Sequence, residues 1–151
     1  MNSKILTLLE FNKILGLLRD QAGSGLAKER IDSLEPMTNT RMAKDALTET
    51  TEAVSVIVHK GSIPVGEIGD ISSIVSMARR GRCLTMRELL QVRASIASSR
   101  QVKAFLKEDM PDGLSIIPEI AGLLDPQVKL EHDIYDAIIS EDEMSDNASP
   151  V

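Results

Sequence analysis

Four basic residues are spaced to form a charged stripe on one helix face. Arg93, Arg100 and Lys107 recur every seven residues, and Lys103 falls beside them. Such a row of cations could neutralise several phosphates of a nucleic acid, with salt-dependent binding as the result. A solvated face, or pairing with acids on neighbouring helices, explains the same stripe. We favour that second interpretation, because the chain as a whole carries a formal net charge of −6.

The stripe lies in a segment whose charge differs from that of the rest of the chain. Residues 79–107 hold eight basic residues and one acid, Glu88, a charge of +7 that leaves −13 for the remainder. This asymmetry indicates either a polar partner for the basic segment or an internal match with the acidic parts.

The other reactive residue types lack the partners that catalysis or metal binding needs. His59 and His132 are far apart, and neither has a carboxylate suitably placed along the sequence, so capping or surface roles are expected. Cys83 has no histidine or acid motif nearby and, as the only cysteine, excludes an intramolecular disulfide. The acids at 141, 142, 143 and 146 lack the alternating spacing of a calcium loop. We therefore assign no catalytic, cofactor-binding or metal-binding residue.

The segment Gly61–Ile71, with three glycines and a proline, interrupts an otherwise helical pattern. It runs into a helix start and could pass for a phosphate cradle. However, Asp70 at that start would repel an anion, and no lysine follows. The segment is therefore predicted to be a structural connector. The sequence also contains no Gly-x-x-x-x-Gly-Lys-Ser/Thr phosphate loop, so ATP binding is not assigned to these residues.

The elements that must position these residues are helices. Apolar residues recur at helical spacing along the chain. The sequence has only three aromatic residues, and this small number favours helix packing over a β-sandwich. We predict a mainly α, elongated multi-helix bundle of about six to seven helices with a Gly/Pro-rich connector at 61–70. Any strand would be short, near 63–65 or Met144. The expected helices cover about 5–22, as one helix or as two with Asn12 capping a restart, then 24–34, 39–60, 71–80, 85–108, 116–124 and 128–139.

Capping signals support these boundaries. The predicted N-terminal caps are Ser24, Thr38 or Asn39, Asp70, and a capping box of Thr85 with Glu88. Gly61 and Gly81, each preceded by basic residues, are predicted to end two of the helices.

Short motifs in a fixed order carry a family resemblance. They are LEFNKI at 9–14, LEP at 34–36, ETTEA at 49–53, GSIPVG at 61–66 with Asp70-Ile71, Ala78 with Gly81 and Leu84, ELL at 88–90, and DNASP at 146–150. In that order and spacing, over essentially the whole chain, they resemble the N-terminal core/lever segment of the second MutS subfamily. These are bacterial ATPases that are related to mismatch-repair MutS and lack its mismatch-recognition domain.

The resemblance implies a division into a helical core/lever segment, 1–139, and an acidic tail, 140–151, truncated before the next family helix. The family tends to have glycine where this chain has Asp142, and it is therefore undecided whether the turn at 141–145 has the tight geometry of the family. Such proteins dimerise through an ABC-type ATPase domain, and their lever and clamp helices embrace branched DNA. In some members a nuclease domain follows. Reported roles are suppression of recombination and rescue of collided ribosomes.

The same resemblance implies that this chain is a non-catalytic helical segment that couples ATPase state to the DNA clamp. ATP and Mg²⁺ belong to a domain absent from it, so it holds no cofactor and is not itself an enzyme. Its expected partners are the remaining domains of the parent protein and, through the full-length protein, branched DNA or the ribosome. Self-association, a cytoplasmic location and no membrane are also expected. The alternative is a free-standing helical module that binds nucleic acid or protein through the basic segment 79–107.

Overall fold

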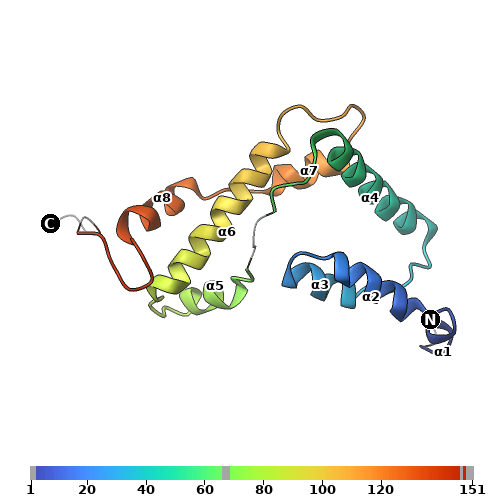
Figure 1. The fold of residues 1–151 in the computed structure, drawn as a ribbon, viewed down its shortest axis with the longest axis horizontal. Coiled ribbons are helices and arrows are strands. Elements are labelled where there is room, and N and C mark those ends of the chain that lie inside the picture. Colours follow the sequence, from blue (N-terminus) through green and yellow to red (C-terminus); the bar gives the residue numbers. More distant parts are fainter. Residues whose placement is uncertain (1–2, 66–68, 147, 149–151) are drawn as a thin grey trace. The chain divides into compact units, whose positions relative to one another are not determined.

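The chain is mainly α-helical, as predicted. The computed structural model describes residues 3–65, 69–146 and 148, and these form eight helices and no strand (Figure 1). The helices are α1 (Ser3–Leu8), α2 (Phe11–Gln21), α3 (Gly25–Asp32), α4 (Thr40–Lys60), α5 (Ser72–Arg79), α6 (Met86–Phe105), α7 (Ile116–Leu123) and α8 (Val128–Ala137). They fall into two compact units, Met1–Leu47 and Thr48–Val151, whose boundary lies inside α4. No helix in the described ranges is both long and apolar enough to cross a lipid bilayer.

Local capping bonds explain where the helices begin. The side chain of Ser24 accepts a hydrogen bond from the amide three residues on, and that of Asn39 accepts bonds from the amides two and three residues on. Asp70 accepts from the amide two residues on. Thr85 and Glu88 form the reciprocal capping box at the start of α6. These bonds satisfy amides that have no partner inside the helix, so the caps predicted at Ser24, Asn39 and Thr85 are confirmed, whereas Asp70 lies one residue before Ile71, the N-cap of α5.

Two glycines end helices for a backbone reason. Gly61 and Gly81 adopt φ angles of 86° and 77°, in the left-handed region that residues with a Cβ rarely enter. They follow α4 and α5, so both predicted C-terminal glycines are confirmed. The connector after Gly61 contains no strand among its described residues. Instead, the amide of Val65 donates to the carbonyl of Ile63 in a tight turn.

The first helical stretch is two helices, which raises the total above the predicted six to seven. Glu10 takes a left-handed conformation, φ 55° and ψ 26°, and α2 begins at the next residue. Asn12 lies inside α2, so its predicted capping role is wrong. The predicted end of the 85–108 helix is also too late, because α6 ends at Phe105 and Lys107 lies in the turn beyond it.

The chain after α8 folds back on itself. Ile138 pairs with Met144 in an isolated antiparallel bridge, and the amide of Ile139 donates to the carbonyl of Glu143. The described residues thus form no strand near Met144, one of the two places where a short one was considered, but only this isolated bridge. Among the described residues only two non-glycine residues have positive φ, and Asp142 is not one of them. The turn therefore closes with ordinary backbone angles where the family tends to have glycine.

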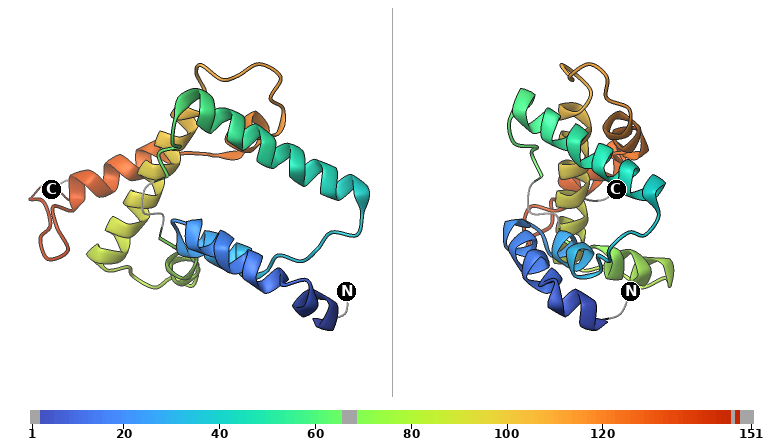
Figure 2. Two further views of the ribbon diagram at one scale, coloured as in Figure 1. Left: turned by 45° about the vertical axis from the view of Figure 1, so that its right-hand side comes forward. Right: turned by 90° about the vertical axis from the view of Figure 1, so that its right-hand side faces the viewer.

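The core of the second unit joins α4, α6 and α7. Val56 of α4 is fully buried, and it packs with Leu106, at the end of α6, and Ala121 of α7. In both figures α7 lies alongside the second half of α4 (Figures 1 and 2). On another side of α6, α8 packs against it, and Ile134 and Ile138 are buried. α6 is therefore the helix on which the second unit is assembled.

The first unit buries much less. α2 packs against α1 and α3, and the Nε atom of Arg19 donates to both carboxylate oxygens of Asp32, at 3.1 and 3.2 Å. Ile31 is buried, whereas α2 has no buried side chain and Leu17 on it is 70% exposed. The apolar residues of α2 lie on one side of the helix, and that apolar face is left largely exposed by its contacts with α1 and α3.

Candidate functional site

Two members of the predicted basic stripe, Arg93 and Arg100, contact α8. The Nε and a terminal nitrogen of Arg100 donate to the two carboxylate oxygens of Glu131, each at 2.9 Å. This paired geometry is the strongest form of an ion pair between side chains. The hydrogen bonds from Arg100 lower the pKa of Glu131 against the opposing effect of desolvation, and the same bonds raise the pKa of Arg100.

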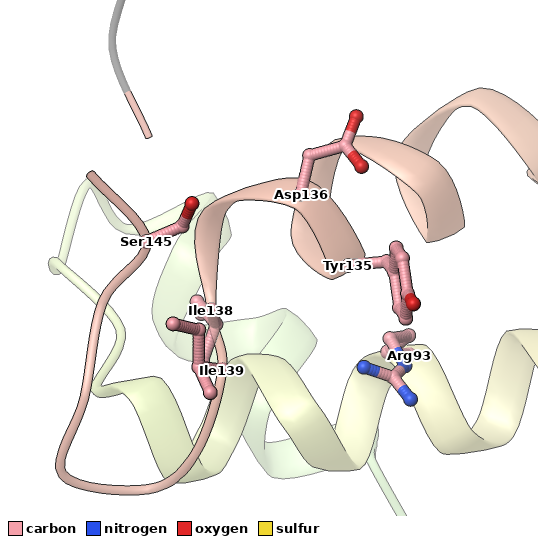
Figure 3. A pocket seen from close by; sticks show the side chains of 6 residues that line it. All are labelled: Arg93, Tyr135, Asp136, Ile138, Ile139 and Ser145. Atoms are coloured by element: carbon pink, nitrogen blue, oxygen red, sulfur yellow. The ribbon is translucent and has the colours of Figure 1, made fainter. Parts of the chain in front are cut away.

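Lys103 and Arg93 also contact neighbouring elements. The Nζ atom of Lys103 donates to the carbonyl of Leu124, the residue that ends α7. The guanidinium of Arg93 lies over the ring of Tyr135, 5.2 Å from its centroid (Figure 3). This is the range of a cation–π contact. Lys107, the fourth member, is exposed in the turn after α6.

The structure thus places Arg93, Arg100 and Lys103 in contacts that hold α6 to α7 and α8. Elsewhere in the basic segment, Arg87 pairs with Glu141 at 2.9 Å. These contacts agree with the interpretation in which basic residues of the segment 79–107 pair with acidic residues elsewhere in the same chain. Contact of the stripe with nucleic acid stays a prediction.

Two hollows open along the seam between α6 and α8. One of about 620 Å³ is drawn in Figure 3, and its lining residues are Arg93, Tyr135, Asp136, Ile138, Ile139 and Ser145. The other, of about 390 Å³, is lined by Arg93, Ala97, Arg100, Val128, Glu131, His132 and Tyr135. Most charged groups in them already have a partner, because Arg100 binds Glu131, Asp136 lies 2.7 Å from the Nδ1 atom of His132, and Arg93 lies over the Tyr135 ring. The described residues also contain no group of three His, Cys, Asp or Glu side chains that could hold a metal ion.

Each histidine lies close to a carboxylate that was not predicted from the sequence. The Nε2 atom of His59 lies 3.5 Å from Asp109, which comes from a distant part of the chain. His132 pairs with Asp136, four residues on, a helical spacing that could have been recognised in the sequence. Both imidazoles are largely exposed, at 46% and 71%, as the expected surface roles require.

A second cluster, which sequence reasoning missed, lies on α4. Glu52 is 6% exposed, and its carboxylate accepts four hydrogen bonds at the start of α7. One oxygen accepts from the amide and hydroxyl of Ser115, at 2.9 and 3.0 Å. The other accepts from the amides of Ile116 and Ile117, at 2.8 and 2.9 Å. The bond from the Ile117 amide is the largest cause of a lowered Glu52 pKa, against which desolvation acts in the opposite direction.

Lys60 makes the matching contact two turns further along α4. Its ammonium donates to the carbonyl of Phe105, the last residue of α6, and to that of Glu108 in the turn beyond, and lies 4.5 Å from the centroid of the Phe105 ring. Lys60 does lie in the last turn of α4, but its ammonium binds these carbonyls outside its own helix. The spacing of four between Glu52, Val56 and Lys60 was visible in the sequence, but nothing there indicated which helices they would meet.

Comparison with known proteins relates the full length of the chain to one group of bacterial proteins. No model of a protein family matches it. The chain is 38% identical over 151 residues to endonuclease MutS2 of Alkaliphilus oremlandii and 37% identical over 150 residues to endonuclease MutS2 of Clostridium botulinum strain Alaska E43. Each match covers 99% of this chain. The chain is homologous to MutS2. A similar match, 38% identical over 152 residues, links it to endonuclease MutS2 of Acetivibrio thermocellus.

The match to MutS2 confirms the resemblance to the N-terminal segment of the second MutS subfamily. The chain spans 19% of the length of these MutS2 relatives, so it corresponds to a small part of them. Both the α6–α8 seam and the Glu52–Lys60 face of α4 lie inside the matched residues.

Proposed function

We propose that this chain is a non-catalytic helical segment of a cytoplasmic MutS-type protein of DNA repair or recombination control, or of ribosome rescue. The observation that carries the proposal is the match to MutS2 over 99% of the chain, which spans only 19% of those relatives. The described polar side chains support it, because the multiple hydrogen bonds of Arg100 and Glu52 link one helix to another. ATP and Mg²⁺ are proposed to bind elsewhere in such a protein. The endonuclease activity that the name of the relatives states is proposed to lie elsewhere as well.

The proposed role is mechanical, namely to couple ATPase state to the DNA clamp through rigid helices. α6 is held at several levels along its length. The turn after α8 contacts its beginning through Glu141 and Arg87, and α8 contacts its middle through Tyr135 and Arg93 and its second half through Glu131 and Arg100. α4 contacts its end through Lys60. A helix held at both ends and in the middle moves with its neighbours as one body, which such coupling requires.

A chimera tests this role. The matched segment of full-length MutS2 from Clostridium botulinum is replaced by this chain, and ATP hydrolysis is measured with and without branched DNA. We expect the double variant Arg100→Met, Glu131→Gln to keep basal hydrolysis and to lose much of the response to DNA. Arg79→Met, an exposed change at the end of α5 in the same basic segment, is the matched control. An unchanged response in a chimera that folds and dimerises would refute the proposed coupling.

The alternative function, nucleic-acid binding through the stripe, needs a different set of variants. Arg100 supports the α6–α8 seam, so its loss would confuse folding with binding. Lys107→Ala changes an exposed residue, Arg93→Ala changes a half-buried one that contacts the Tyr135 ring and lacks the paired bonds of Arg100, and Lys129→Ala on α8 removes an equal charge outside the stripe. If the stripe binds phosphates, the two stripe variants lower affinity and flatten its salt dependence, and the control does not. Equal behaviour of all three would exclude this alternative.

The partners proposed for the chain are the remaining domains of the parent protein and, through them, branched DNA or the ribosome. The exposed apolar residues of the first unit support the first of these. Leu8, Ile14 and Leu17 are 83%, 58% and 70% exposed. In the absence of such domains, the same surface is proposed to drive self-association.

A further inference from the structure

One face of α4 holds both ends of the turn between α6 and α7. Glu52, Val56 and Lys60 are each four residues apart, a spacing that puts them on one side of a helix. Glu52 binds the start of α7 and Lys60 binds the end of α6, while Val56 is fully buried between them. The turn, residues 106–115, is thus held at its two ends by two charges of opposite sign.

The contact at the start of α7 requires a carboxylate. The first amides of a helix have no acceptor within the helix and lie at its partially positive end. Glu52 offers two oxygens, and each accepts from two donors out of Ser115, Ile116 and Ile117. A glutamine would keep one oxygen and turn donor hydrogens towards the other two donors. A neutral isostere therefore satisfies at most half of this arrangement.

The contact at the end of α6 is its electrostatic counterpart. The last carbonyls of a helix have no donor within the helix and lie at its partially negative end. The ammonium of Lys60 donates to one of these, the carbonyl of Phe105, and to the carbonyl of Glu108 in the turn just beyond the helix. The two contacts are independent in geometry, because they use different residues of α4 and opposite ends of two helices. They nevertheless hold one and the same turn.

We propose that α4 acts as a strap across the α6–α7 turn. The carboxylate of Glu52 and the ammonium of Lys60 fix the two ends of the turn, and Val56 seals the space between them. Glu52 and Lys60 are positioning residues, which make α4, α6 and α7 respond to displacement as one body. This goes beyond the proposed function, since it holds for the chain itself in whatever larger protein it serves.

Amide hydrogen exchange on the full chain tests the strap. In Glu52→Gln, the amides of Ile116 and Ile117 should exchange at least about tenfold faster, since they lose a charged acceptor. The amide of Ile138, which is bonded within the α8 segment, should keep its rate. The matched control is Glu49→Gln, an exposed change on the same helix. Unchanged rates at both amides, or the same acceleration in the control, would overturn the proposal.

The other end of the strap has its own measurement. Lys60→Met keeps most of the aliphatic stem and removes the ammonium, so the amides of Leu106 and Lys107 should exchange faster while those of Ile116 and Ile117 change less. A Lys60→Met protein whose whole turn exchanges at the original rate would show that one end alone holds it, contrary to the proposal.

A rescue experiment separates a carboxylate contact from a general loss of packing. Glu52→Ala leaves the donors at the start of α7 without their acceptor, and a small carboxylate can enter the space. Sodium formate should restore slow exchange at Ile116 and Ile117, and sodium chloride of equal ionic strength should not. Equal effects of the two salts would overturn the assignment of a carboxylate-specific contact. If Glu52→Ala does not fold, the Glu52→Gln comparison decides the question.

Discussion

Substitution of Val56 gives the sharpest prediction of stability. Among the described residues this side chain is the most completely removed from solvent, at 0% exposure, and it packs against Leu106 and Ala121. Val56→Ala removes two methyl groups, worth about 1.6 kcal/mol in transfer free energy, and leaves a small cavity, so we expect a total loss of about 2–3 kcal/mol. Folded domains have total stabilities of roughly 5–15 kcal/mol, and the loss is therefore a large share.

Val58→Ala is the matched control, because the same chemical change occurs two residues along the same helix. Val58 is 80% exposed, so its methyl groups stay largely in water when the chain folds. Alanine also has the higher helix propensity, and we expect a change within about 0.5 kcal/mol, in either direction.

Urea unfolding followed by far-ultraviolet circular dichroism measures both variants. The chain has no tryptophan, so the helical signal is the practical probe. We expect a lower midpoint for Val56→Ala with an unchanged dependence on denaturant. Equal midpoints for the two variants would refute the view that α4 is anchored in the second unit through this residue.

Three further predictions concern pH, backbone geometry and association. The pKa of Glu52 is lowered from its ordinary value of 4.5, so its contribution to stability is present above that pH and is lost as the pH falls through the lower, folded value. Unfolding midpoints at several pH values should show the cost of Glu52→Gln shrinking below 4.5, and a cost independent of pH would contradict this. Gly61→Ala should lower stability by about 1–2 kcal/mol because φ is 86°, while Gly23→Ala, where no positive φ occurs, should not; equal thermal midpoints would count against the backbone argument. Sedimentation velocity should show concentration-dependent association that Leu17→Glu weakens, and a strictly monomeric protein would refute the proposed apolar docking face.

Local features of the fold could be predicted from the sequence because neighbouring residues decide them. The side chains of Ser24, Asn39 and Thr85 bond to amides two or three residues away, and Gly61 ends α4 through its own backbone angles. Such interactions need no tertiary partner, so helix starts and stops were mostly correct. The break at Glu10 was left open between one helix and two, because a left-handed glutamate has no strong sequence signal.

The partners of the charged side chains required the tertiary structure. Heptad spacing identified the stripe of Arg93, Arg100 and Lys103, but only the position of α8 and the end of α7 showed which groups these side chains contact within the chain. The same holds for Glu52, whose acceptor bonds span more than 60 residues of sequence.

The sequence by itself determined the helical class, the capped helix ends and the relationship to MutS2, because each of these rests on local bonds or on an ordered set of motifs. The tertiary structure decided that the charged side chains of Glu52, Lys60 and Arg100 bind groups of neighbouring helices and turns. Charge and periodicity place a side chain on a helix face, whereas its partner is set by the packing of elements that are far apart in the chain.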